Sequence, residues 1–239
     1  MRSRKRNAAA HSLPRVSPSY RTHVAFVPLV TLTFIMWMLY RILFRFPASY
    51  AVAFDEIIGK AIFFGLPVWL YFNITRSQAI AETFSARRLQ SGLLLGIAVG
   101  GMFGFMGVLA SLVGHKVEVQ AAPLFGSNVF WWQFFLALMT GLWESLFFFS
   151  WIFTVIREKY AKWALVNQLL LLAVLFLVFH LPNTILRSSQ FPWTVVVAQL
   201  FLLFFFALGQ ALFFVRTRNL YALMVSHAIW GMVLFVHTR

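Results

Sequence analysis

The sequence predicts an all-α protein that folds as a polytopic transmembrane helix bundle of about seven spans. Two observations support this prediction. Of its 239 residues, 61% are hydrophobic and only 11% are charged, with a mean hydropathy of +0.81, which is far too apolar for a soluble surface. The apolar residues also fall into runs of about 20, the length at which a helix crosses a bilayer.

The apolar runs set the expected limits of the spans. We expect helices at residues 23–40, 55–74, 91–113, 128–156, 163–181, 193–215 and 220–236. The fourth run is long enough to be bent, which leaves an eighth span or a re-entrant segment open. On this layout residues 1–22 form a basic, disordered cytoplasmic tail, and residues 23–239 form a single transmembrane helical domain.

The distribution of basic residues predicts the orientation. The chain has 20 Lys and Arg against 6 Asp and Glu, and six of the basic residues lie within the first 22 positions. A basic segment beside a first membrane helix is typical of an orientation signal or of contact with anionic lipid, not of nucleic-acid binding. With the N-terminus in the cytoplasm, inner segments hold fourteen basic residues and outer segments five. We therefore expect the lipid bilayer, and no nucleic acid, as a partner, in the plasma (inner) membrane of a prokaryote.

One carboxylate stands in the middle of an apolar run. Glu144 has no basic residue within twelve positions, and a bare carboxylate at bilayer depth costs at least a few kcal/mol, which indicates a function. Thr140 and Gly141, on the same helical face, are small enough to let another helix approach. A protonated Glu that only hydrogen-bonds a neighbouring helix is the alternative. The other acidic residues are explained by helix starts, loops and span ends: Asp55, Glu56, Glu82, Glu118 and Glu158.

Two histidines also lie within apolar runs. His180 and His227 belong to different predicted helices, whereas the other four histidines fall in tails, loops or span ends. A single membrane histidine is explained by a bond between helices. Two of them together with Glu144 favour convergence on one cavity. At 1.5 Å per residue, however, the three lie roughly 10 to 25 Å from the inner helix ends, so convergence requires tilted helices or shifted boundaries.

Glu and two His can hydrolyse an acyl bond by general-base catalysis. The carboxylate takes a proton from water, one imidazole orients that water, and the other donates to the oxyanion. The same three groups could bind a metal ion, but HExxH is absent, and we expect neither metal nor cofactor. A Ser nucleophile is disfavoured because no GxSxG surrounds Ser145, Ser150 or Ser226. Asn183, one turn after His180, reaches the site if Pro182 does not end the helix.

Three short motifs resemble those of a known family. Glu144-Ser-Leu-Phe-Phe-Phe149 resembles EExxxR, Phe176-Leu-Val-Phe-His180 matches FxxxH, and His227-Ala-Ile-Trp-Gly231 resembles HxxxN. In these motifs the chain is similar to the membrane-embedded CAAX prenyl protease and bacteriocin-processing family, called CPBP or Abi. The resemblance implies an intramembrane glutamic protease in which Glu144 and His180 activate water and His227 stabilises the oxyanion. It also implies supporting roles for Ser145, Phe176, Asn183 and Gly231.

The motifs depart from the family pattern at three positions. Ser145 replaces a Glu, Phe149 an Arg and Gly231 an Asn. Loss of one oxyanion donor typically costs roughly 100- to 1000-fold in rate, unless another donor such as Asn183 replaces it. We expect an intramembrane endopeptidase acting on a membrane-associated or lipidated peptide. The alternative is a catalytically impaired relative that acts as a partner-binding, immunity or scaffold protein. A transporter is disfavoured because the sequence has no inverted repeat.

Overall fold

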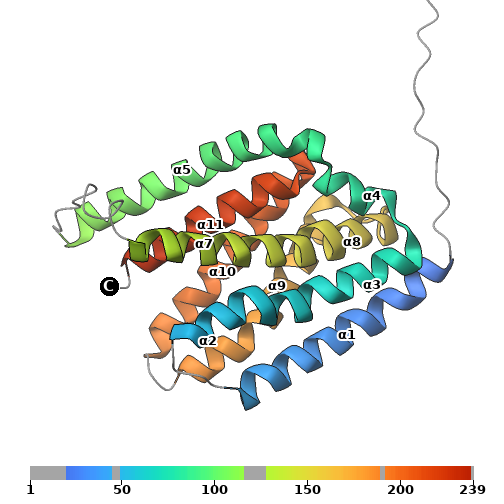
Figure 1. The fold of residues 1–239 in the computed structure, drawn as a ribbon, viewed down its shortest axis with the longest axis horizontal. Helices are drawn as coiled ribbons and strands as arrows, with labels where there is room; N and C mark the ends of the chain where they lie inside the picture. The colour runs from blue at the N-terminus through green and yellow to red at the C-terminus, as the bar shows by residue number, and fades with distance from the viewer. Residues whose placement is uncertain (1–19, 45–48, 116–127, 189–191, 238–239) are drawn as a thin grey trace, which may run out of the picture.

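The computed structural model describes residues 20–44, 49–115, 128–188 and 192–237, and within these ranges the chain is helical without a strand. The predicted all-α class is confirmed. Figure 1 shows α1 (Tyr20–Leu43), α3 (Leu66–Thr75), α7 (Asn128–Glu144), α11 (Leu220–His237) and α5 (Leu89–His115) following one another across the bundle. Behind them lie α9 (Leu165–Ser188) and α10 (Trp193–Thr217), which pack on each other.

Six helices of the described chain are long and apolar enough to cross a membrane, and they agree with the predicted runs. They are Ala25–Leu43, Val52–Thr75, Ala86–Met106, Asn128–Lys159, Leu165–Ile185 and Trp193–Thr217, with Leu220–Met232 as a shorter apolar helix. The protein is therefore an integral membrane protein. Its orientation and the membrane in which it lies stay predictions, and residues 1–19 of the predicted tail lie outside the described residues.

The predicted end of the fifth helix at residue 181 is wrong, because α9 continues through Pro182 to Ser188. A proline inside a helix removes one backbone donor and weakens the preceding turn. Here side chains provide donors to carbonyls of that turn. Trp37 Nε1 donates to the Phe179 carbonyl at 3.2 Å, and Thr184 Oγ1 donates to the His180 carbonyl at 3.1 Å. The segment between the predicted second and third spans also holds short helices: α4 (Gln78–Ala81), η3 (Glu82–Phe84) and η4 (Ala86–Arg88).

Two helices contain π-helical segments, in which the backbone bonds run from residue i to i+5. In the fourth span, α7 continues without a break into η5 (Ser145–Phe153) and α8 (Thr154–Lys159). In the second span, α2 (Ser49–Phe54) is followed by η1 (Asp55–Gly59) and η2 (Ala61–Gly65). Such segments are frequent at functional sites, and here they adjoin Glu144 and flank Lys60.

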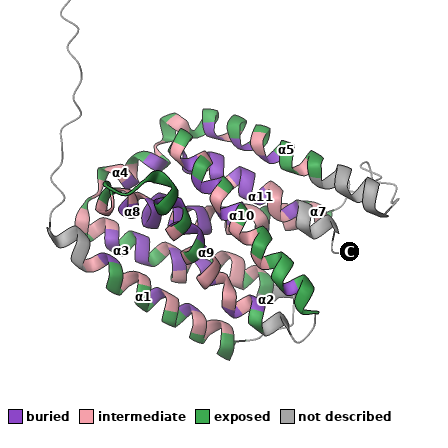
Figure 2. Cartoon of the chain, turned by 180° about the vertical axis from the view of Figure 1, so that it is seen from behind, coloured by how far each residue is buried: buried purple, intermediate pink, exposed green. Residues whose placement is uncertain are grey.

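The side chains of η5 form the centre of the core. Phe147, Phe148, Phe149 and Trp151 are all fully buried, and their rings pack on aromatic residues of neighbouring helices. Figure 2 shows buried residues along the inner helices and exposed residues on the outer sides of α1 and α5. The exposed side chains there are largely apolar, as a lipid-facing surface requires.

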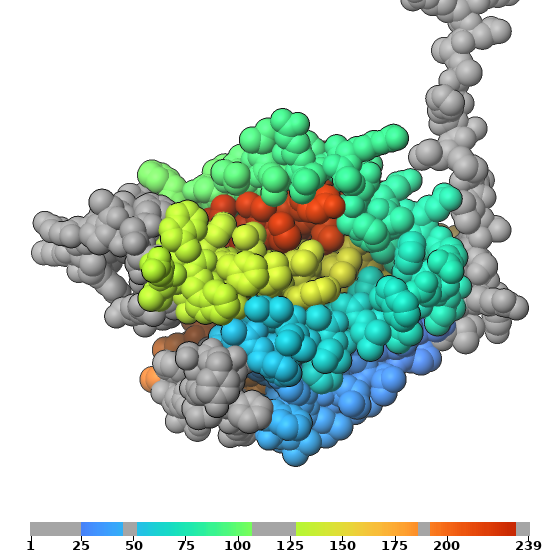
Figure 3. All heavy atoms as spheres, viewed as in Figure 1, coloured from blue at the N-terminus to red at the C-terminus, as the bar shows by residue number. Residues whose placement is uncertain are grey.

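Glycines let α11 lie close to both of its neighbours, and Figure 3 shows it in the groove between α5 and α7. On α5, Gly92, Gly96 and Gly100 recur every four residues and face α11. On α7, a Cβ at Gly141 would lie only 2.5 Å from the Met224 carbonyl oxygen of α11. Small residues at this spacing allow two membrane helices to approach closely.

We predict that Gly141→Ala lowers the free energy of unfolding by about 1–3 kcal/mol, the usual effect of overpacking. Its methyl group would push α11 away from α7. The measurement is thermal unfolding in detergent, with Gly209→Ala as the control because a Cβ at Gly209 meets nothing within 4 Å. Equal melting temperatures for the two variants would contradict the close packing.

Candidate active site

Glu144 lies at the junction of α7 and η5, and its side chain is only 6% exposed. Its Oε1 atom accepts a hydrogen bond of 2.8 Å from Lys60 Nζ. The ammonium group is itself buried and also contacts Glu56 Oε2 at 2.5 Å. A buried charge is tolerated when it is paired and hydrogen-bonded, so Lys60 compensates for the burial of Glu144.

Glu56 is held in turn by Thr140, whose hydroxyl donates to Glu56 Oε2. Glu56 and Lys60 are four residues apart on the second span, and Thr140 and Glu144 are four residues apart on α7. Contacts between the two spans therefore link residues from both into one polar network. This network fixes Oε1 of Glu144 and leaves Oε2 to face the histidines.

His180 is oriented by its own helix. Its Nδ1 atom lies 2.8 Å from the Phe176 carbonyl oxygen, and its ring stacks on the Phe176 ring at 4.2 Å with 23° between the planes. Because a carbonyl only accepts, Nδ1 carries the proton, and in the neutral ring Nε2 presents a lone pair. Nε2 lies 3.6 Å from Glu144 Oε2, slightly beyond a direct hydrogen bond.

His227 approaches the same oxygen from α11, across the close contact at Gly141. Its Nε2 atom lies 3.5 Å from Glu144 Oε2, and its ring meets Phe206 edge-on at 4.8 Å. Its Nδ1 atom is buried and has no hydrogen-bond partner among the described residues. The tautomer that suits a neighbouring carboxylate oxygen is the one with the proton on Nε2. The structure thus brings Glu144, His180 and His227 together, although counting from the helix ends placed them at different depths.

A small polar cavity adjoins Glu144 and His180. Its volume of about 30 Å³ is room for about one water molecule. Its lining comes from the first, second, fourth and fifth spans. The residues are Trp37, Arg41, Asp55, Glu56, Lys60, Phe64, Glu144, Phe179, His180 and Asn183.

The remaining predicted site residues differ in their surroundings. Phe176 supports His180, and Asn183 reaches the cavity and accepts a hydrogen bond from Arg41 Nε. Ser145 is fully buried, and its hydroxyl has no hydrogen-bond partner among the described residues. Gly231 lies one turn after His227, and a Cβ there would meet only Ala137 Cβ, at 3.8 Å. Phe149, in place of the family's Arg, is fully buried in the aromatic core.

Four charged residues of this site were not predicted from the sequence: Lys60, Glu56, Arg41 and Asp55. Asp55 and Glu56 were expected only to begin a helix, but Glu56 pairs with Lys60, and Asp55 forms an ion pair with Arg41 of α1. A signal was present in the sequence. Lys60 is a charge inside a predicted span, and the rule that singled out Glu144 applies to it equally.

A family model described as type II CAAX prenyl endopeptidase Rce1-like matches residues 126–233. Over these residues, which make up less than half of the chain, the protein is similar to that family. The match covers all three predicted motifs and confirms the resemblance, and it supports a peptidase in general. No curated protein and no solved structure matches the chain.

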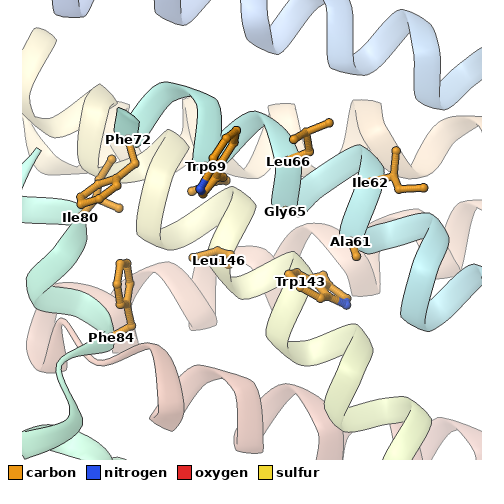
Figure 4. Close-up of a pocket in the computed structure, with 11 residues that line it drawn as sticks. Ala61, Ile62, Gly65, Leu66, Trp69, Phe72, Ile80, Phe84, Trp143 and Leu146 are labelled. Carbon is orange, nitrogen blue, oxygen red and sulfur yellow. The ribbon is translucent and has the colours of Figure 1, made fainter. Parts of the chain in front are cut away.

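An apolar pocket with a volume of about 520 Å³ lies near the polar cavity. Figure 4 shows it between the second span and the fourth, with Trp69, Leu66 and Phe72 on one side and Trp143 and Leu146 on the other. Ala61 and Trp143 line it, and they are the chain neighbours of Lys60 and Glu144. The second and fourth spans therefore line both the apolar pocket and the polar cavity.

We predict that Lys60→Met destabilises the protein by about 3–5 kcal/mol, because it leaves two carboxylates without their buried cation. Unfolding in detergent measures the loss, and Lys162→Met, at an exposed position, is the control. Adding Glu144→Gln to Lys60→Met should recover part of the loss, because it removes one of the two unpaired charges. A Lys60→Met protein as stable as the control would mean that the ion pairs contribute little.

Proposed function

We propose that this protein is an intramembrane endopeptidase that hydrolyses a peptide bond with a water molecule activated by Glu144 and His180. The observation that carries the proposal is the close approach of two side chains: Glu144 Oε2 and His180 Nε2 lie 3.6 Å apart. Because Nδ1 donates to the Phe176 carbonyl, the lone pair of the neutral imidazole is on Nε2, so that both facing atoms are acceptors in this form.

Two facing acceptors need a donor between them or beside them. A water molecule in the adjoining cavity satisfies both by donating one hydrogen to each. Its lone pairs are then directed away from both groups and toward an incoming carbonyl carbon. The two acceptors thereby orient the water and withdraw its protons as it attacks, which is general-base catalysis.

The remaining steps follow from the same groups. When the water oxygen bonds to the carbonyl carbon, one water proton passes to the Glu144–His180 pair and the carbonyl oxygen becomes an oxyanion. His227 Nε2–H, beside Glu144 Oε2, donates to that oxyanion. The carbon–nitrogen bond then breaks, and the proton held by the pair passes to the leaving nitrogen. Lys60 keeps its proton throughout and holds Oε1 of Glu144.

The position of Lys60 favours this water mechanism over metal-assisted hydrolysis. A divalent ion on Glu144 would compete with an ammonium group that already lies 2.8 Å from Oε1 and 2.5 Å from Glu56 Oε2. Like charges at such separations repel strongly in a medium of low dielectric. The two imidazoles are therefore assigned to proton transfer and oxyanion binding.

The apolar pocket supports a lipidated or strongly apolar substrate. A pocket of about 520 Å³ lined by apolar side chains is within the usual range for small-molecule and cofactor sites. Because Ala61 and Trp143 connect its wall to Lys60 and Glu144, a chain bound there would anchor a peptide near the polar cavity.

A catalytically impaired, partner-binding relative is the second candidate. Two observations favour it. Phe149 is buried among aromatic rings and contributes no charge to the site, and Gly231 contributes no side chain to the oxyanion.

We predict that Glu144→Gln lowers the rate of cleavage of a membrane peptide by about 100- to 10,000-fold, the range that general-base catalysis supplies. The amide keeps the shape of the side chain but cannot accept the water proton. Cleavage would be followed by mass spectrometry in proteoliposomes, with Glu82→Gln at an exposed position as the control. Unchanged cleavage by a folded Glu144→Gln protein would falsify the assignment, and a wild-type protein that binds a partner without cleaving it would favour the second candidate.

We also predict that Leu66→Trp raises the KM for a lipidated peptide at least several-fold and leaves the KM for the same peptide without lipid unchanged. Leu66 lines the pocket, and the larger ring would fill part of it. Leu70→Trp is the matched control, because Leu70 lies one turn further along α3, is also exposed and does not line the pocket. Equal effects on both peptides would exclude the pocket as the lipid site.

A further inference from the structure

We infer that Asn183 supplies a second hydrogen-bond donor to the oxyanion, and that Arg41 orients its amide for this task. The inference rests on the proposed hydrolysis, since an oxyanion forms only if water attacks a carbonyl. It assigns a direct part in the reaction to a residue of the fifth span and a positioning part to a residue of α1.

The contact with Arg41 decides which way the Asn183 amide is turned. Arg41 Nε donates to Asn183 Oδ1. A guanidinium group has donors only, so the oxygen of the amide must face it. The nitrogen therefore occupies the other branch of the planar amide, and its two hydrogens are directed away from Arg41. No hydrogen bond joins this nitrogen to another of the described residues.

Arg41 is itself held firmly. Its Nη1 atom forms an ion pair with Asp55, and its guanidinium carbon lies 5.1 Å from the centre of the Trp37 ring. Trp37 is buried and donates to the Phe179 carbonyl of α9. The arginine is thus fixed to the second span and to the fifth, and the orientation of Asn183 does not depend on a free surface side chain.

Asn183 lies on the side of α9 that faces the cavity beside Glu144. It follows His180 by three residues, which places the two side chains on one helical face. The helix continues through Pro182, so this relation holds. Both side chains line the same small cavity as Glu144, which has room for the activated water, and the carbonyl that this water attacks must lie directly beside it.

None of the other side chains described at the site supplies a second donor to the oxyanion. His227 provides one donor, whereas Gly231, one turn later, provides none from a side chain. Lys60 has donors, but its ammonium group is held between two carboxylates. Oxyanion sites commonly combine two or more donors, and Asn183 is the neutral amide that lines the cavity.

The test is steady-state cleavage of a membrane peptide by Asn183→Asp. Aspartate keeps the size of the side chain and still accepts from Arg41, but it has no donor. We expect kcat to fall about 100- to 1000-fold, the usual effect of losing one oxyanion donor, with KM changed less than threefold. Asn73→Asp is the matched control, because Asn73 only donates to the Trp69 carbonyl of its own helix.

A rescue experiment separates an oxyanion role from a structural one. A Cβ at Gly231 meets only Ala137 Cβ at ordinary contact distance, so Gly231→Asn can place an amide on the His227 face of α11. We expect the double variant Asn183→Asp, Gly231→Asn to have a kcat at least tenfold higher than that of Asn183→Asp alone. If Asn183→Asp does not fold, Asn183→Ala carries the same expectations.

The outcomes distinguish this inference from the proposed function. Wild-type kcat in a folded Asn183 variant overturns the inference, and so does a loss that Gly231→Asn does not reverse, while loss of cleavage in Glu144→Gln would still support the hydrolase. Full cleavage by Glu144→Gln removes the hydrolase itself, and the inference with it.

Discussion

A buried ammonium group between two carboxylates is the constraint on which the polar site depends. Lys60 contacts Glu56 and Glu144 at 2.5 and 2.8 Å, and all three groups lie within membrane-spanning helices. Removing such charges from water is tolerable only if they stay in contact, so the second and fourth spans must pack side by side at this level. Two carboxylates and one ammonium leave an excess negative charge. The two histidines that face Glu144 Oε2 are the groups that can share a proton with it.

The two carboxylate oxygens of Glu144 consequently have different partners. Oε1 is fixed by Lys60, while Oε2 faces His180 and His227. The aromatic core keeps this arrangement rigid, since Phe148 and Phe176 both pack against the His180 ring. The cavity of about 30 Å³ holds about one water molecule but not a peptide. The Arg41–Asp55 pair joins two of the helices that line this cavity.

The amino-acid sequence predicted the helices well, because apolar runs of bilayer length are an unambiguous signal. It also singled out Glu144, His180 and His227, since each stands alone among apolar residues. Lys60 carried the same signal, a charge inside a predicted span, but its pairing with Glu144, 84 positions away, could not be predicted, because side-chain pairing between spans leaves no local pattern. No pattern in the sequence predicted the π-helical segments beside Lys60 and Glu144. Pro182 suggested a helix end, whereas donors from Trp37 and Thr184 to neighbouring carbonyls accompany an unbroken helix.

The segment that matches the family model does not contain all the charged residues of the site. Residues 126–233 resemble the Rce1-like family and contain Glu144, both histidines and Asn183. At the three motif positions where it departs from the family pattern, this segment has Ser145, Phe149 and Gly231. The groups that pair with its polar residues come from the first quarter of the chain: Lys60 and Glu56 hold Glu144, and Arg41 with Asp55 holds Asn183. Because a buried carboxylate without its cation is strongly destabilised, the matched segment depends on the second span for the ammonium group that pairs with Glu144. The first two spans are therefore part of the site, and the departures from the motifs have to be weighed together with the charges that those spans contribute.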